Sequence, residues 1–259
     1  MDPRTTALVL IGYQNDYFAE DGILHGVIES STDSVLKNTI ALLQALEKTD
    51  ALIITTPINF TPDYGELIDP VGILQVIKDA GAFKAKTSGA GTIPEISAFG
   101  DRIIEVPGKR GLNAFASTNL DKILQNRGIK TVALAGAITS ICIDSTGRAA
   151  FEKGYKVVQL SDCISSRTSL EESFYCSTVF PLYASVMDSN VFLKGLGLRK
   201  QGATKRPKQS ATTKPKTPSR QTAPPKPREK PVQSAKSRQG TKPAQSPRPK
   251  QTGQTRRSA

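Results

Sequence analysis

The fold is decided most clearly by residues 131–160, which read TVALAGAITSICIDSTGRAAFEKGYKVVQL. Two short apolar runs, Thr131 to Ala135 and Lys156 to Leu160, flank a stretch with helical spacing that stops at Gly154. A strand, a helix and a second strand in this order form a parallel pair, because parallel strands need a crossover connection. The stretch therefore predicts one βαβ unit of an α/β domain.

Similar runs occur along the rest of residues 1–198. Four more strands are predicted at Ala7 to Ile11, Leu52 to Thr56, Arg102 to Val106 and Ala184 to Met187. Helices are predicted at Val35 to Leu46, Thr118 to Gly128, Ser140 to Lys153 and Ser169 to Phe180, the last with a cap at Thr168. Strands that are apolar on both faces predict a three-layer, doubly wound, mostly parallel six-stranded sheet of the Rossmann-like type. Ligands bind such sheets beyond the carboxyl ends of the strands.

One segment of this region lacks the alternation. Residues 61–100 are irregular and rich in Gly and Pro, with a possible helix from Val71 to Asp79. We predict that this segment forms a lid or an oligomer contact.

Charge divides the chain at about residue 198. Residues 199–259 hold 18 Lys or Arg, one acid and 10 of the 17 prolines, whereas residues 1–198 hold 17 basic and 22 acidic side chains. A basic globular body is thus excluded. Because the tail has no Leu, Ile, Met or aromatic residue, it is predicted to be disordered and to bind nucleic acid or other polyanions without sequence preference.

The cysteine count and the N-terminus bear on the compartment. Three cysteines do not make a disulfide framework, and the first residues do not resemble a signal peptide. No apolar run reaches the ~20 residues of a membrane span. The expected compartment is the cytoplasm.

Cys142 lies where the strand from Thr131 runs into the following helix. The amides and dipole at a helix N-terminus stabilise a thiolate, and the same amides donate to an oxyanion formed when the thiolate attacks a carbonyl. The alternative is a small buried thiol that only fills space. The spacing alone leaves both interpretations open.

Several separated segments resemble the isochorismatase-like cysteine hydrolase family over residues 5–190. They are ALVLIGYQNDY at 7–17, Lys109 with Phe115, Thr118 and Leu120, the segment 136–150 with Thr139, Cys142, Thr146, Arg148 and Ala150, and Gly154-Tyr155 followed by Asp162. The resemblance implies a six-stranded doubly wound sheet and an Asp, Lys, Cys triad. It further implies cleavage of a carbon-nitrogen bond in a small amide through a covalent thioester.

The resemblance assigns a role to particular residues. Cys142 falls on the nucleophile and Lys109 on the lysine that stabilises the thiolate. The family's cis peptide bond falls on Ile138-Thr139, and the backbone of Ile138, Thr139 and Cys142 is predicted to bind the oxyanion. The pocket is predicted to include Gln14, Tyr17 and Phe115.

The position of the catalytic Asp is occupied by Gly12, which cannot accept a proton. Asp16 is the candidate substitute base, although carboxylates in such turns more often cap backbone amides.

The metal ligands of the family's nicotinamidase branch are also missing, because residues 55–59 read TTPIN and the single histidine is His25. We therefore expect neither a metal nor a cofactor.

Two functions stay open from the sequence. The first is a cysteine hydrolase of a small-molecule amide that uses Cys142 and Lys109. The second is a catalytically silent member of the family that binds a ligand or acts as a scaffold. The resemblance also implies a homo-oligomer.

Overall fold

The computed structural model describes residues 1–28 and 32–198, so the predicted disordered tail lies outside the described residues. Within them, one sheet has the order β3-β2-β1-β4-β5-β6, and all neighbouring strands are parallel. The strands are β1 Thr6–Ile11, β2 Leu52–Thr56, β3 Ile104–Glu105, β4 Thr131–Ala137, β5 Lys156–Ser165 and β6 Ser185–Met187. Because the order reverses between β1 and β4, the predicted doubly wound sheet is confirmed.

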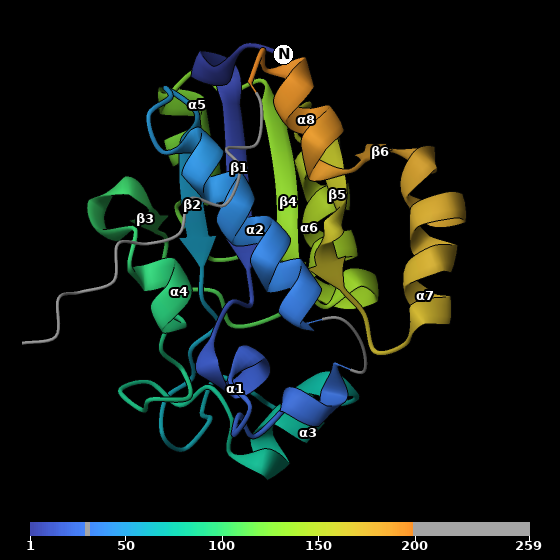
Figure 1. The fold of residues 1–259 in the computed structure, drawn as a ribbon. Coiled ribbons are helices and arrows are strands. Elements are labelled where there is room, and N and C mark those ends of the chain that lie inside the picture. The colour runs from blue at the N-terminus through green and yellow to red at the C-terminus, as the bar shows by residue number, and fades with distance from the viewer. Residues whose placement is uncertain (29–31, 199–259) are drawn as a thin grey trace, which may run out of the picture. The chain divides into compact units, whose positions relative to one another are not determined.

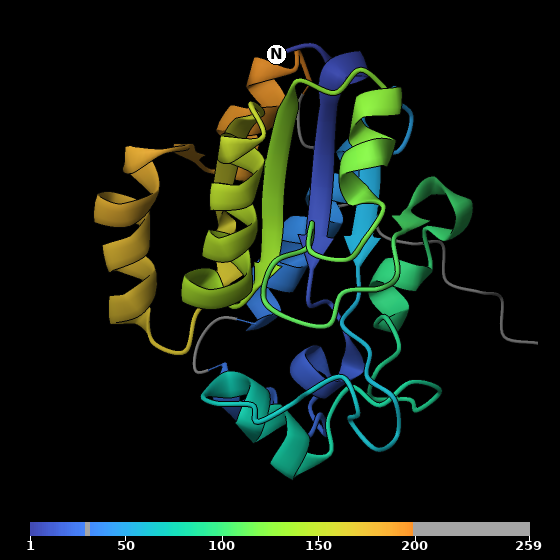
Figure 2. The ribbon, with the colours of Figure 1, turned by 180° about the vertical axis from the view of Figure 1, so that it is seen from behind.

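Helices cover both faces of this sheet. α2 (Thr32–Leu46) and α8 (Ser189–Gly195) lie on the face seen in Figure 1, and α5 (Leu120–Asn126) and α6 (Asp144–Glu152) lie on the face seen in Figure 2. The other helices are α1 Asn15–Phe18, α3 Ile73–Ala80, α4 Pro94–Ser97 and α7 Ser169–Phe174. Single turns are formed by Pro3–Thr5, His25–Val27, Gly100–Arg102, Thr139–Ile143, Tyr175–Val179 and Phe180–Leu182. The fold has the three predicted layers.

Strand β1 shows why the sequence lacks a clean alternation. Leu8 and Leu10 join the core under α2 and α8, whereas Val9 and Ile11 join the core under α5 and α6. All four side chains are buried, and each contributes roughly 1.5–3 kcal/mol of apolar burial. A strand covered on both faces has no polar side.

Two strands differ from the predicted length by three residues or more, whereas the other four agree to within two residues. The run 102–106 forms only the two-residue β3, because Gly100–Arg102 is a 3-10 turn and the Arg102 guanidinium donates to the carbonyls of Leu46, Thr49 and Ala51. Strand β5 is longer than predicted and shifts register opposite Leu134 to Gly136. At this shift Ser161 and Asp162 interrupt the run of apolar residues. The apolar run therefore ends at Leu160, although the strand continues to Ser165.

Two predicted helices contain wider turns. The helix predicted from Ser140 to Lys153 begins as a π turn, Thr139–Ile143, before α6. The helix predicted from Ser169 to Phe180 leaves the α form after Phe174. Its predicted cap is confirmed, because Thr168 Oγ1 accepts a hydrogen bond of 3.1 Å from the Glu171 amide.

The irregular segment contains the helix expected there, α3, which begins after Gly72. Figure 1 shows α3 beyond the end of the sheet at which the arrowheads of β1 and β2 lie. In the described part of the chain, no helix is long and apolar enough to cross a membrane.

Candidate active site

The carboxyl ends of β1 and β4 meet at the centre of the sheet, where the strand order reverses. Gly12 follows β1, and Ile138 follows β4. Doubly wound sheets bind ligands at such a point. Both segments that resemble the family's motifs therefore reach the same place.

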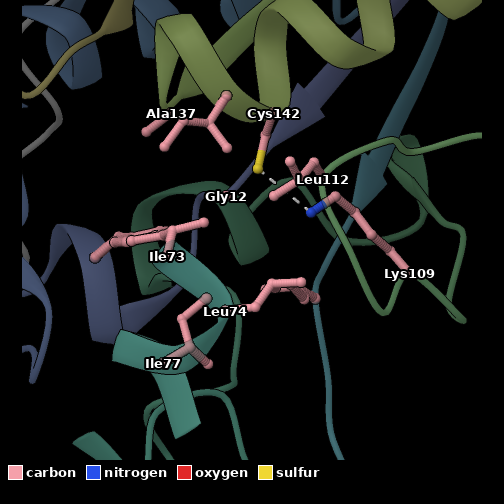
Figure 3. A pocket seen from close by; sticks show the side chains of 11 residues that line it. Gly12, Ile73, Leu74, Ile77, Lys109, Leu112, Ala137 and Cys142 are labelled. Atoms are coloured by element: carbon pink, nitrogen blue, oxygen red, sulfur yellow. Dashed lines mark hydrogen bonds between the residues drawn. The ribbon is translucent and has the colours of Figure 1, made fainter. Parts of the chain in front are cut away.

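Cys142 lies in the π turn Thr139–Ile143, directly after β4. Ile138 precedes the turn in an extended conformation, and its carbonyl oxygen accepts from the amides of Ile141 and Ile143. The thiol is buried, with 7% of the residue exposed. Figure 3 shows its sulfur pointing into a pocket rather than into the sheet.

A cis peptide bond is present in this turn, but one residue before the predicted position. It joins Ala137 to Ile138, so the prediction of Ile138-Thr139 is wrong. Strand β4 ends at Ala137, and the carbonyl of Ile138 already accepts hydrogen bonds within the turn. The chain therefore leaves the strand at the Ala137-Ile138 bond, one residue earlier than predicted. Thr139 is fully buried, and its Oγ1 has no hydrogen-bond partner among the described residues.

Lys109 comes from the loop after β3. The loop is held to the segment after β2, because Lys109 forms a bridge with Ile58 and its carbonyl accepts from the Asn59 amide. Only 2% of Lys109 is exposed. Its Nζ donates to Cys142 Sγ over 3.6 Å, which is the only hydrogen bond of this ammonium within the described residues (Figure 3). The structure thus brings together two of the three triad positions.

The pocket around this pair is small and apolar. Its free volume of about 10 Å³ holds about one water molecule. It is lined by Gly12, Tyr17, Ile58, Ile73, Leu74, Ile77, Lys109, Leu112, Ala137, Ile141 and Cys142. None of these residues carries a carboxylate.

Gly12 has a backbone reason to be glycine. Its φ is +74°, and a Cβ built on it would lie 2.8 Å from the carbonyl oxygen of Ala137. Residues with a Cβ rarely adopt this conformation, and glycine adopts it freely. The third triad position thus offers a close backbone approach instead of a proton acceptor.

Asp16 is buried in α1, and its carboxylate serves another segment. Asp16 Oδ2 accepts a hydrogen bond of 2.6 Å from the Phe83 amide. Its backbone amide donates to Gly89, whose missing side chain leaves room for the carboxylate. Asp16 is not among the residues that line the pocket. The amide-capping interpretation describes these contacts.

Of the three predicted pocket residues, only Tyr17 lines the pocket. Burial, followed by the proximity of Cys142 and Asp16, raises the pKa of Tyr17 far above its ordinary value, so its hydroxyl stays protonated. The Gln14 side chain donates to the carbonyls of Ile58 and Ala90 and accepts from the Ile58 amide. Phe115 packs on Tyr155 under α5 and α6.

The pocket also has an apolar wall opposite the thiol, whose residues were not among the predicted site residues. The wall is formed by Ile73, Leu74 and Ile77 of α3 (Figure 3). Leu112 and Ile141 also line the pocket. The helical spacing of the three α3 residues signals an inward face. It does not show that the face lies over Cys142, because that depends on the path of the irregular segment.

The other thiols and the histidine lie in ordinary structural surroundings. Burial raises the pKa of Cys163 to about 12 and that of Cys176 to about 11. His25 Nδ1 lies 3.1 Å from the carbonyl of Tyr17. Across residues 1–28 and 32–198, no group of three or more His, Cys, Asp or Glu could hold a metal ion.

The sequence is similar to proteins of one known family. The isochorismatase domain model matches residues 6–191. The isochorismatase family protein YwoC of Bacillus subtilis is 35% identical over 86 residues, which cover 33% of this chain and 46% of that protein. The ureidoacrylate amidohydrolase RutB of Methylorubrum extorquens is 26% identical over 62% of this chain and 70% of its own length.

A solved structure shows the same fold. The cysteine hydrolase from Pseudomonas syringae pv. phaseolicola superposes with a TM-score of 0.68 at 17% identity, over 76% of this chain and 94% of that one. Because the isochorismatase domain model matches residues 6–191, which are most of the chain, this chain belongs to the isochorismatase family of hydrolases.

Proposed function

We propose that this protein is a cysteine hydrolase that cleaves the carbon-nitrogen bond of a small amide. The observation that carries the proposal is the buried contact of 3.6 Å between Lys109 Nζ and Cys142 Sγ. A buried ammonium is stable only beside a compensating charge or hydrogen-bond acceptor. A thiolate at Cys142 supplies both. The similarity to RutB, named as an amidohydrolase, supports the choice of bond.

The absence of a carboxylate from the pocket lining restricts where the protons can go. Three lining side chains carry an exchangeable proton, namely Tyr17, Lys109 and Cys142. Tyr17 keeps its proton, because its pKa is raised by burial. Lys109 is therefore the group that can take the proton of Cys142 and later give it to the leaving amine.

The reaction then has two stages. In the first, the Cys142 thiolate attacks the amide carbon, a carbon-sulfur bond forms, and the carbon-nitrogen bond breaks as the amine takes a proton from Lys109. In the second, water attacks the thioester and releases the carboxylic acid and the thiol. The backbone amides of Ile138, Thr139 and Cys142 are proposed to bind the oxyanion in both stages.

Gly12 favours a second candidate function. With φ at +74° and no carboxylate in the lining, the pocket lacks the base that the family's triad uses. A silent member that binds a ligand beside Cys142 needs no base. Hydrolysis and binding make opposite predictions for turnover.

The test measures release of ammonia or amine from a panel of primary amides, ureido compounds and carbamoyl compounds. We expect turnover in the wild type and a loss of at least about 10³-fold in Cys142→Ala and in Lys109→Met. Cys176→Ala is the matched control and should keep full activity, since this thiol lies outside the pocket. Activity in Cys142→Ala would refute the nucleophile. No turnover with any amide would favour the binding protein.

We also propose that the basic tail, residues 199–259, binds polyanions and that the body forms a homo-oligomer. The 18 Lys or Arg of the tail against one acid support the first proposal. Removal of the tail should abolish retention on heparin and leave the melting temperature of the body unchanged. Retention by the truncated protein would place the basic surface elsewhere, and a monomer in solution would refute the oligomer.

A further inference from the structure

A groove of about 870 Å³ adjoins the Cys142 pocket, which holds about 10 Å³. Four residues line both spaces, namely Ile73, Leu74, Leu112 and Ile141. All four present aliphatic side chains, which can rotate. The groove has the size of a small-molecule site, whereas the pocket at the sulfur does not.

The two walls of the groove differ in chemistry. One wall, from α3 and the turn before it, carries Val71 and Val76, which are 82% and 45% exposed. The other carries Ser140, Ser145 and two guanidinium groups. Arg148 is paired with Asp144 over 2.9 Å and Arg167 with Glu171 over 3.0 Å. The charges are compensated within the protein, whereas the apolar wall has no cover in the described chain.

We propose that this groove binds an uncharged aliphatic chain on the substrate, whose carbonyl reaches Cys142 between Ile73, Leu112 and Ile141. The inference rests on the proposed function for the reaction, but the binding itself does not depend on turnover. A groove that continues to the sulfur, with one exposed apolar wall and no uncompensated charge, favours a long neutral amide over a short or ionic one. Each buried methylene should raise affinity about fourfold.

The proposal requires the pocket to open slightly at the sulfur. A carbonyl group is larger than the room for one water molecule, so Leu74 and Leu112 must turn aside when the chain enters. The backbone of β4 and the π turn can stay in place. Selectivity for chain length therefore resides in side chains of α3 and the loop after Lys109.

The experiment alkylates the full-length protein with N-methyl and N-octyl iodoacetamide and follows each cysteine peptide by mass spectrometry. The thiolate displaces iodide, so no hydrolysis is needed. We expect the octyl to methyl rate ratio to be at least about tenfold at Cys142 and near one at Cys176, which serves as an internal control. Val76→Asp should bring the ratio at Cys142 close to one. Val191→Asp, on α8, is the matched control because Val191 is 48% exposed, and it should keep the ratio.

A ratio near one at Cys142 in the wild type, or a high ratio that persists in Val76→Asp, would overturn the proposal. Failure of Cys142 to react with either reagent would overturn it as well, because the groove then does not lead to the sulfur. If Val76→Asp brings the octyl to methyl ratio at Cys142 near one and also forms a smaller oligomer than the wild type, the groove is assigned to an interface between copies of the chain and the proposal is overturned. If the wild type turns over no amide but still shows the octyl preference at Cys142, the proposed hydrolase activity is refuted and the proposed binding of an aliphatic chain in the groove stands.

Discussion

The turn after β1 and the turn after β4 meet at the centre of the sheet, yet only the second carries a cysteine. A glycine with positive φ lies at each junction: Gly12, at +74°, follows β1, and Gly136, at +124°, is the last residue but one of β4. A Cβ on Gly136 would overlap the carbonyl oxygen of Ile11, and one on Gly12 would lie 2.8 Å from that of Ala137. The ends of β1 and β4 are therefore packed backbone to backbone. The comparison teaches that the segment after β1 is shaped by close backbone packing and offers no proton acceptor at position 12.

The largest expected effect is on turnover. Gly12→Asp supplies a carboxylate beside Cys142 and should raise amide turnover about 10²- to 10⁴-fold, the usual size of general-base assistance. The positive φ at position 12 costs about 1–2 kcal/mol of stability, although Asp adopts such a φ more readily than most residues. The new Cβ, 2.8 Å from the Ala137 carbonyl oxygen, adds to this cost because the backbone must shift. Initial rates and urea denaturation measure the two effects separately.

The control for this variant is Gly12→Asn, which has nearly the same shape and backbone preference but no base. An equal rise in both variants would attribute the gain to geometry. A rise that survives addition of Cys142→Ala would mean that the new carboxylate works without the thiol. If the wild type is already as fast as Gly12→Asp, another base is present in the protein.

The second effect is on stability and compares the two glycines directly. Gly136→Ala should lower the free energy of unfolding by about 3 kcal/mol or more, because the Cβ meets the backbone of β1 at a distance no side chain can relieve. Gly12→Ala should cost about 1–2 kcal/mol. Gly26→Ala is the control within about 0.5 kcal/mol, since a Cβ there meets no atom within 4 Å. If Gly136→Ala and Gly12→Ala lower the free energy of unfolding equally, the backbone shifts equally easily at both positions.

The third effect compares the thiol of the β4 turn with the other two. At pH 8, iodoacetamide should label Cys142 roughly 100-fold faster than Cys163 or Cys176. Burial raises the pKa of those thiols to about 12 and about 11, so their thiolate fractions stay at or below about 10⁻³. Below these pKa values each pH unit raises the labelling rate tenfold.

Peptide mapping over pH 7 to 10 checks this prediction, and Lys109→Met should slow the labelling of Cys142. If Cys176 is labelled first, Cys142 is a space-filling thiol. An unchanged rate in Lys109→Met would mean that the ammonium does not support a thiolate.

The smallest effect concerns the carboxylate that remains near the β1 turn. Asp16→Asn weakens the hydrogen bond to the Phe83 amide and should cost about 1 kcal/mol of stability. The rate of Cys142 labelling should change less than about twofold, because the carboxylate faces the loop of Phe83 and Gly89. A large loss of amide turnover without a loss of stability would instead identify Asp16 as the base.

Much of the fold and part of the site follow from local sequence. The strands β1, β2 and β4 are apolar runs bounded by turn residues, and Cys142 and Lys109 are placed by their motifs. The lengths of strands β3 and β5 were predicted less accurately, because their ends are set by contacts with other segments. Strand β3 is two residues long because the Arg102 side chain turns the chain back to distant carbonyls, and β5 continues through a register shift that its own residues do not signal.

The sequence by itself determined the strand-and-helix alternation, the separate basic tail and the absence of an acid at position 12, because these depend on residue type and spacing. Tertiary structure decided the positive φ at Gly12, the binding of Asp16 to the Phe83 amide, and the apolar cover of α3 over the sulfur. Each of these depends on segments that are distant in sequence. Their contacts arise only when the ends of parallel strands and the irregular segment meet in space.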